Sequence, residues 1–174
     1  MEYEFYKALE ILEQTPNTLK QFLSNLSDEW IFCNEGEDTW SAFDIVGHLI
    51  HGEKTDWIPR LKIMLNDSET KTFEPFDRFA QFEESEGKTM TQLLDEFSEL
   101  RKQNISFLKP LNISEKDVAK KAIHPSLGEV TLKNLLSTWV VHDLGHIAQI
   151  SRVMAKQYKN EVGPWAAYLS VLNK

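Results

Sequence analysis

The chain has a single cysteine, no long apolar run and no surplus of basic residues. Because Cys33 stands alone, it cannot form an internal disulfide, which fits a reducing compartment, and we expect a cytoplasmic protein. No apolar run approaches the roughly 20 residues that a membrane-spanning helix needs. The first residues, MEYEFYKALEILEQ, carry acids from position 2 and lack the apolar stretch of a signal peptide. These absences disfavour a secreted or membrane protein.

Positive charge is scarce in this chain. Its 174 residues include 19 Lys and Arg against 27 Asp and Glu, a formal net charge of −8. Such a field repels phosphate backbones and anionic lipid surfaces, so we expect neither nucleic acid nor a membrane as a partner. Hydrophobic residues make up 41% and charged residues 26%, as in ordinary soluble proteins. The length predicts one domain over residues 1–174.

Apolar residues recur at helical spacing in four long segments. In chain order these segments cover roughly residues 2–26, 42–65, 90–108 and 131–154. No internal repeat and no alternating strand pattern is evident, and the connections between the segments are long and polar. The sequence therefore predicts an all-α fold, a four-helix bundle with long crossover connections. After Gly163-Pro164 the tail should pack back as a short helix or turn.

Two prolines interrupt the helical segments. Thr15-Pro16 predicts a joint in the first segment, because proline lacks a backbone donor and Thr15 can cap the helix that follows. Ser41 and Asp44 match a capping box at the start of the second segment. Within that segment, Pro59 predicts a kink or the start of a new helix.

The histidines are the strongest candidates for a functional site. His142 and His146 are four residues apart in the fourth segment, so their side chains project from one helix face about one turn apart. That spacing can place two imidazoles on one metal ion, and bundle sites usually draw further ligands from a facing helix. His48, early in the second segment, is the leading third ligand. On spacing alone, a histidine pair without a metal is an equal alternative.

Other residues have less specific interpretations. His51 is a fourth ligand, a hydrogen-bond partner of a ligand or a solvent-facing residue, and the last two are favoured. His124 precedes Pro125 in a connection and is expected to have no metal role. Asp143 is out of register for an HExxH protease helix. Cys33 has no histidine near it in sequence and is expected to be a structural thiol. No catalytic residue is predicted.

Several motifs together carry a family resemblance. They are Trp40-Ser41 ahead of Gly47-His48-Leu49, Glu74-Pro75-Phe76-Asp77, Thr131-Leu132 through Thr138-Trp139-Val140, His142-Asp143-Leu144-Gly145-His146-Ile147-Ala148-Gln149-Ile150, and Gly163-Pro164-Trp165. In this order, over nearly the whole chain, they resemble the DinB-like superfamily, close to the branch of bacillithiol-transferase-like proteins. Gly145 departs from the pattern, since relatives often have a polar residue there; this bears on substrate specificity rather than on metal binding.

The resemblance implies a four-helix bundle, commonly a homodimer, with a metal held by His48, His142 and His146. It also implies a metal-dependent thiol S-transferase, in which one divalent ion activates a low-molecular-weight thiol such as bacillithiol against an electrophilic substrate. Imidazole ligands suit several transition metals, of which zinc and then nickel are expected. A metal-dependent hydrolase and a non-catalytic metal-binding stress-response protein are the alternatives, because fold and ligands do not establish catalysis.

Overall fold

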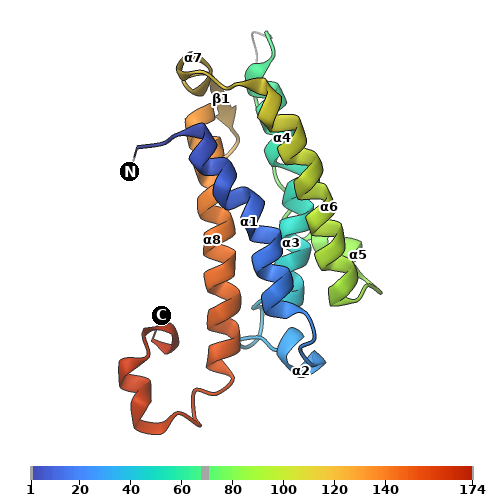
Figure 1. Cartoon of the computed structure of the whole chain (residues 1–174), viewed down its shortest axis with the longest axis vertical. Helices are drawn as coiled ribbons and strands as arrows, with labels where there is room; N and C mark the ends of the chain where they lie inside the picture. The colour runs from blue at the N-terminus through green and yellow to red at the C-terminus, as the bar shows by residue number, and fades with distance from the viewer. Residues whose placement is uncertain (1, 68–70, 174) are drawn as a thin grey trace.

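The computed structural model describes residues 2–67 and 71–173. Within this part, four long helical segments form a bundle (Figure 1). They are α1 (Phe5–Leu23), the consecutive α3 (Ala42–Thr55) and α4 (Trp57–Leu65), α6 (Met90–Leu108) and α8 (Leu132–Lys156). α1 packs against α6 and α8, and α3 packs against the same two helices. The predicted all-α bundle is confirmed, and none of the described helices is long and apolar enough to cross a membrane.

Shorter elements lie in the connections and in the tail. In chain order they are α2 (Asp28–Ile31), α5 (Ala80–Ser85), η1 (Lys109–Leu111), α7 (Glu115–Val118), β1 (Lys121–His124), β2 (Gly128–Thr131), η2 (Gly163–Tyr168) and η3 (Ser170–Leu172). η3 packs back onto α8, as expected of a tail with a short helix. Residues 68–70 of the second connection lie outside the described part.

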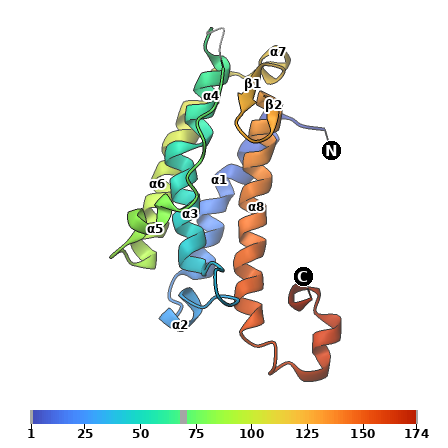
Figure 2. The same ribbon diagram turned by 180° about the vertical axis from the view of Figure 1, so that it is seen from behind.

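The antiparallel hairpin of β1 and β2 was not predicted. Each strand has four residues, too few for a clear alternation, and Ala122 is buried whereas Ile123 is 46% exposed. The connection after α4 extends this hairpin: Phe73 N–H donates to the Ile123 carbonyl at 2.9 Å, and Ile123 N–H donates to the Lys71 carbonyl at 2.7 Å. Figure 2 shows the hairpin beside α8 and the connection running from α4 down to α5. These contacts hold the connection next to the hairpin.

The joint predicted at Thr15-Pro16 is absent, because α1 runs continuously through both residues. Proline has no N–H, so the carbonyl of Leu12, four residues earlier, loses its helical partner. A guanidinium nitrogen of Arg101 on α6 donates to that carbonyl at 2.7 Å. Thr15 caps nothing; its hydroxyl donates to the Ile11 carbonyl. A tertiary hydrogen bond thus replaces the one that proline removes.

The second segment breaks before Pro59 rather than at it. Asp56 separates α3 from α4, and Pro59 lies in the first turn of α4, where a missing N–H leaves no helical hydrogen bond unmade. The capping box of Ser41 and Asp44 at the start of α3 is confirmed. Of the two outcomes expected at Pro59, a new helix is therefore the observed one.

A layer of buried charge divides the apolar core into two clusters. Arg101 binds Asp143 through both terminal nitrogens, at 2.6 and 3.0 Å, and Glu53 at 2.8 Å; all three residues are at most 3% exposed. Trp139 and Asn104 also donate to Glu53. One apolar cluster contains Leu12, Trp57, Ile105 and Trp139, and the other contains Leu19, Ile50, Phe97 and Ile150. Along each long helix, the charged layer lies where one cluster gives way to the other.

Gly47 allows α5 to approach α3 closely. A Cβ at this position would lie 2.5 Å from Ser85 Oγ, on α5, so Gly47→Ala should lower the free energy of unfolding by about 1–3 kcal/mol. Gly145→Ala is the matched control on α8, where a Cβ meets nothing within 4 Å and alanine should stabilise the helix by about 0.5–1 kcal/mol. Urea unfolding measures both values. Equal effects of the two substitutions would contradict the close approach at Gly47.

Candidate metal centre

Two helices bring three histidine side chains together. His48 comes from α3, and His142 and His146 come from successive turns of α8. The Nε2 atom of His142 lies 3.0 Å from that of His48 and 3.1 Å from that of His146. Each ring offers one ligand atom, and the three ligand atoms lie within 4.8 Å of one another. A search of the described residues for three or more His, Cys, Asp or Glu side chains this close together finds this group. The sequence interpretation therefore names the three side chains that converge.

The donor atoms fit a divalent cation. In a neutral imidazole one nitrogen carries the proton and the other a lone pair. Because Nδ1 of His146 donates to the Gln149 side-chain oxygen at 2.9 Å, its Nε2 holds the lone pair. Bonds from zinc to histidine nitrogen of about 2.0–2.1 Å place neighbouring ligand nitrogens about 3 Å apart. The two observed separations match this spacing, so one cation fits between the three Nε2 atoms.

Packing orients the other two rings. Nδ1 of His48 and Nδ1 of His142 are buried without a hydrogen-bond partner among the described residues. Instead, the Trp40 ring lies 4.9 Å from the His48 ring, and the edge of the Trp57 ring system meets His142 at 5.1 Å, between centroids. Trp57 itself stacks on buried Trp139 at 5.4 Å. Aromatic contacts from Trp40, just ahead of α3, and from α4 and α8 thus hold the histidines in place.

The surroundings keep all three histidines neutral. Burial lowers the pKa of His48 to about 3, helped by the repulsion that a protonated His48 would meet from protonated His146 and His51 and from Arg78. Burial, with His146, His48 and Arg101, lowers the pKa of His142 to about 2. Burial also lowers the pKa of His146, opposed by its hydrogen bond to Gln149 and by the charge of Asp143. Neutral imidazole is the form that binds metal ions.

The three histidines form one wall of a cavity of about 630 Å³. Trp40, Trp57 and Phe76 line it with aromatic surface, and the hairpin turn contributes His124, Pro125 and Leu127 to the lining. Arg60 and Arg78 also line it, together with Asp56. The connection after α4 supplies Phe73, Pro75, Phe76 and Arg78, so its pairing with β1 helps to shape the cavity. This volume holds a small organic molecule.

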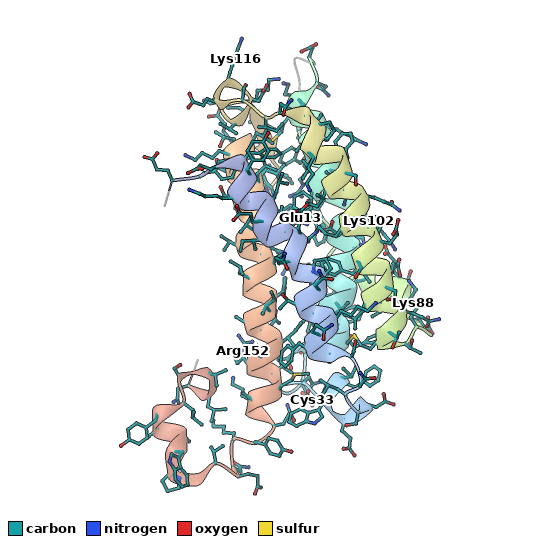
Figure 3. All side chains as sticks on the ribbon, in the orientation of Figure 1. Glu13, Cys33, Lys88, Lys102, Lys116 and Arg152 are labelled. Carbon is teal, nitrogen blue, oxygen red and sulfur yellow. The ribbon has the colours of Figure 1, made fainter. Side chains whose placement is uncertain are left out.

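The remaining histidines and the cysteine lie outside the cluster. His51 is not solvent-facing, as one favoured interpretation had it: it is 5% exposed, and Nδ1 donates to Glu84 on α5 at 2.9 Å. His124 lies at the hairpin turn, away from the three ligand atoms but on the cavity wall. The Cys33 thiol donates to the Trp30 carbonyl at 3.2 Å, at the α2 end of the bundle (Figure 3). Burial raises the pKa of the Cys33 thiol, which fits a structural role.

Sequence reasoning missed several residues around the site. Arg60, Arg78 and Gln149 were not singled out, and neither were the buried charges of Arg101 and Glu53. Two of them had a readable signal. Gln149 lies three residues after His146 on one helix face, and Arg101 lies four residues from both Phe97 and Ile105, on the apolar stripe of α6. Arg60 and Arg78 carry no such local pattern.

Comparisons with known proteins agree with this fold. The chain is 28% identical over 150 residues to YfiT of Bacillus subtilis (strain 168), a protein named as a putative metal-dependent hydrolase; the match covers 84% of this chain and 82% of that protein. A solved structure of YfiT from Bacillus subtilis, described as a probable metal-dependent hydrolase with an unusual four-helix bundle topology, superposes with a TM-score of 0.76. That match has 24% identity and covers 90% of this chain and 89% of the other. The DinB superfamily model matches residues 11–150, and the chain therefore belongs to the DinB superfamily.

Proposed function

We propose that His48, His142 and His146 bind one divalent metal ion through Nε2 and that the protein is a metal-dependent thiol S-transferase. The observation that carries this proposal is the convergence of three neutral imidazoles on the wall of a cavity large enough for a small thiol and an electrophile. Three protein ligands leave a coordination position free for a reactant, as in catalytic rather than structural sites. When bound, the cation favours the thiolate of a thiol ligand over its neutral form.

The cavity offers few groups that can remove a proton, which matters more for water than for a thiol as the nucleophile. Among the described lining residues the one carboxylate is Asp56, whose Oδ1 lies 2.6 Å from Arg60 Nε in an ion pair. His124 accepts two backbone hydrogen bonds at Nδ1 and so presents an N–H. His124 is therefore a donor rather than a base at this wall, and Asp56, whose pKa burial raises against the charge of Arg60, is the one candidate base among these lining residues. A thiol has a pKa of about 8.5, far below the value of about 15.7 for water, and therefore needs less help to ionise.

The proposed reaction joins a thiol to an electrophilic carbon. The S–H bond and the bond from carbon to the leaving group break, a C–S bond forms, and the proton departs with the leaving group. The chain holds its three imidazoles neutral and in position through Trp40, Trp57 and Gln149. Zinc is the proposed ion, with nickel second, because imidazole suits both.

A metal-dependent hydrolase is the second candidate. It is favoured by the name of the relative YfiT, and the same three ligands suit a cation that acidifies water. To separate the two, zinc-loaded protein is incubated with bacillithiol, glutathione or coenzyme A plus 1-chloro-2,4-dinitrobenzene, and in parallel with p-nitrophenyl acetate. We expect conjugation above the uncatalysed rate with at least one thiol, abolished by a chelator. Ester hydrolysis without any conjugation would favour the hydrolase, and neither reaction would favour a non-catalytic metal protein.

We also propose a homodimer formed through the outer face of α8. Val141 is 66% and Leu144 47% exposed, and exposed Ala148 continues the same stripe one turn on. Such a stripe is the surface that a second copy would cover. Sedimentation equilibrium should give twice the chain mass of 20.2 kDa, and Leu144→Glu should return it to the single value. A wild-type mass equal to one chain would contradict the dimer.

A further inference from the structure

The cavity beside the three histidines is positively charged although the chain as a whole is negative. Arg60 and Arg78 line it, and Asp56, the one carboxylate among the described lining residues, is already paired with Arg60. Asp77, next to Arg78 in the sequence, does not line the cavity, and its carboxylate accepts the Phe79 N–H. A bound divalent cation would add two further positive charges. In a protein of net charge −8, this is a local reversal of sign.

Among the arginines, Arg78 is the one for which the described residues provide no carboxylate partner. Of the four arginines in the chain, Arg60 pairs with Asp56, Arg101 with Glu53 and Asp143, and Arg152 with Glu35. Within the described residues, Arg78 forms no hydrogen bond or ion pair, and it is exposed to solvent at the cavity. It lies close enough to His48 for its charge to contribute to the lowered pKa of that ring.

The hairpin turn adds a neutral donor to the same cavity. His124 Nδ1 accepts the backbone N–H groups of Ser126 at 3.1 Å and Leu127 at 3.3 Å. Because Nδ1 is an acceptor, the proton of the neutral ring is on Nε2. Nε2 makes no hydrogen bond within the described part of the chain. The turn therefore supplies an N–H donor from a residue that lines the same cavity as Arg78 and the three histidines.

We propose that the molecule bound in this cavity carries a carboxylate group, which Arg78 binds. The planar guanidinium matches a carboxylate in two parallel hydrogen bonds, and such charge-assisted pairs are stronger than neutral ones. The His124 N–H and the terminal nitrogens of Arg60, which have no hydrogen-bond partner within the described residues, are further donors for this anionic group. In terms of the proposed function, on which this part rests, the thiol is anionic: its sulfur lies at the three histidines and its carboxylate at Arg78.

Three thiols that differ in charge test the inference on the zinc-loaded protein. Mercaptosuccinate carries two carboxylates, 2-mercaptoethanol is neutral and cysteamine carries an ammonium group. Calorimetry should show mercaptosuccinate binding about tenfold or more tightly than 2-mercaptoethanol, with cysteamine weakest. Arg78→Gln should remove this preference while leaving the zinc content and the affinity for 2-mercaptoethanol unchanged. Lys102→Gln, at an exposed cation on α6 that does not line the cavity, is the matched control and should keep the preference.

A second measurement separates this inference from the proposed catalysis. Succinate has the carboxylates without the sulfur, and metal-free wild-type protein should bind it more tightly than the Arg78→Gln variant does. If no thiol is conjugated but both binding preferences are found, the transferase proposal fails and the carboxylate site stands. Equal affinities for the three thiols in the wild type, or a preference that survives Arg78→Gln, would overturn the carboxylate site whatever the activity.

Discussion

Replacing His142 with alanine should abolish stoichiometric metal binding at neutral pH. Its Nε2 lies between the other two donor atoms, 3.0 Å from that of His48 and 3.1 Å from that of His146. Without it, only two histidine ligands remain for the metal ion. Loss of a residue that merely supports a metal ligand costs about 10–100-fold in affinity, and loss of a ligand should cost more. Elemental analysis of the purified variant, after incubation with zinc and gel filtration, measures the result.

Two histidines outside the cluster provide the controls. His124→Ala removes a ring from the cavity wall, and His51→Ala removes a buried ring paired with Glu84, yet neither ring contributes to the convergent donor set. Both variants should retain one zinc per chain. Circular dichroism should show that His142→Ala keeps its helices, because the bundle core does not depend on this ring. Full metal retention by His142→Ala would refute the assigned ligands.

Replacing Arg101 with methionine should cost roughly 3–5 kcal/mol of stability, the usual effect of removing one partner from a buried ion pair. Its guanidinium satisfies Glu53, Asp143 and the Leu12 carbonyl that Pro16 leaves without a helical partner. Methionine fills most of the space but leaves two buried carboxylates uncompensated. Urea unfolding of the metal-free protein measures the loss without a contribution from bound ion.

Two substitutions on the bundle surface provide the comparison. Lys102 is the exposed neighbour of Arg101 on α6 (Figure 3), and Lys102→Met should change stability by less than about 0.5 kcal/mol. Lys20→Ala breaks an exposed ion pair with Asp95 on α6 and should cost no more than about 1 kcal/mol. If Arg101→Met were as stable as these variants, the buried layer would not contribute to the fold as inferred.

The choice between His48 and His51 shows where sequence reasoning reaches its limit. The two residues are three apart on one helix, so both belong to the same broad face and spacing cannot rank them. In the structure, His48 turns toward α8 and meets His142, whereas His51 turns toward α5 and meets Glu84. That difference depends on how α3 is rotated in the bundle and on Gly47 admitting α5. The family resemblance pointed to His48 because the ligand positions of a family already reflect how its helices pack.

The cavity wall was beyond prediction for a related reason. Arg78 lies in a polar connection and His124 in a short hairpin, and neither segment has the periodicity from which an element can be predicted. Their common wall exists because the backbone of Lys71 and Phe73 pairs with Ile123, about 50 residues later in the chain. Such long-range pairing produces no recognisable residue pattern within either segment. The anionic ligand inferred for the cavity could therefore be argued only after folding had brought these residues together.

The local pattern of residues determined the four long helical segments, the capping box of Ser41 and Asp44 and the facing pair His142 and His146. Apolar periodicity, capping and one-turn spacing are properties of neighbouring residues, so they can be read without knowledge of the fold. Only the tertiary structure decided that α1 continues through Pro16, that Arg101 lies buried between two carboxylates, and that His48 completes the cluster. Each of these depends on contacts between residues 42 to 94 positions apart, which form only when the helices pack.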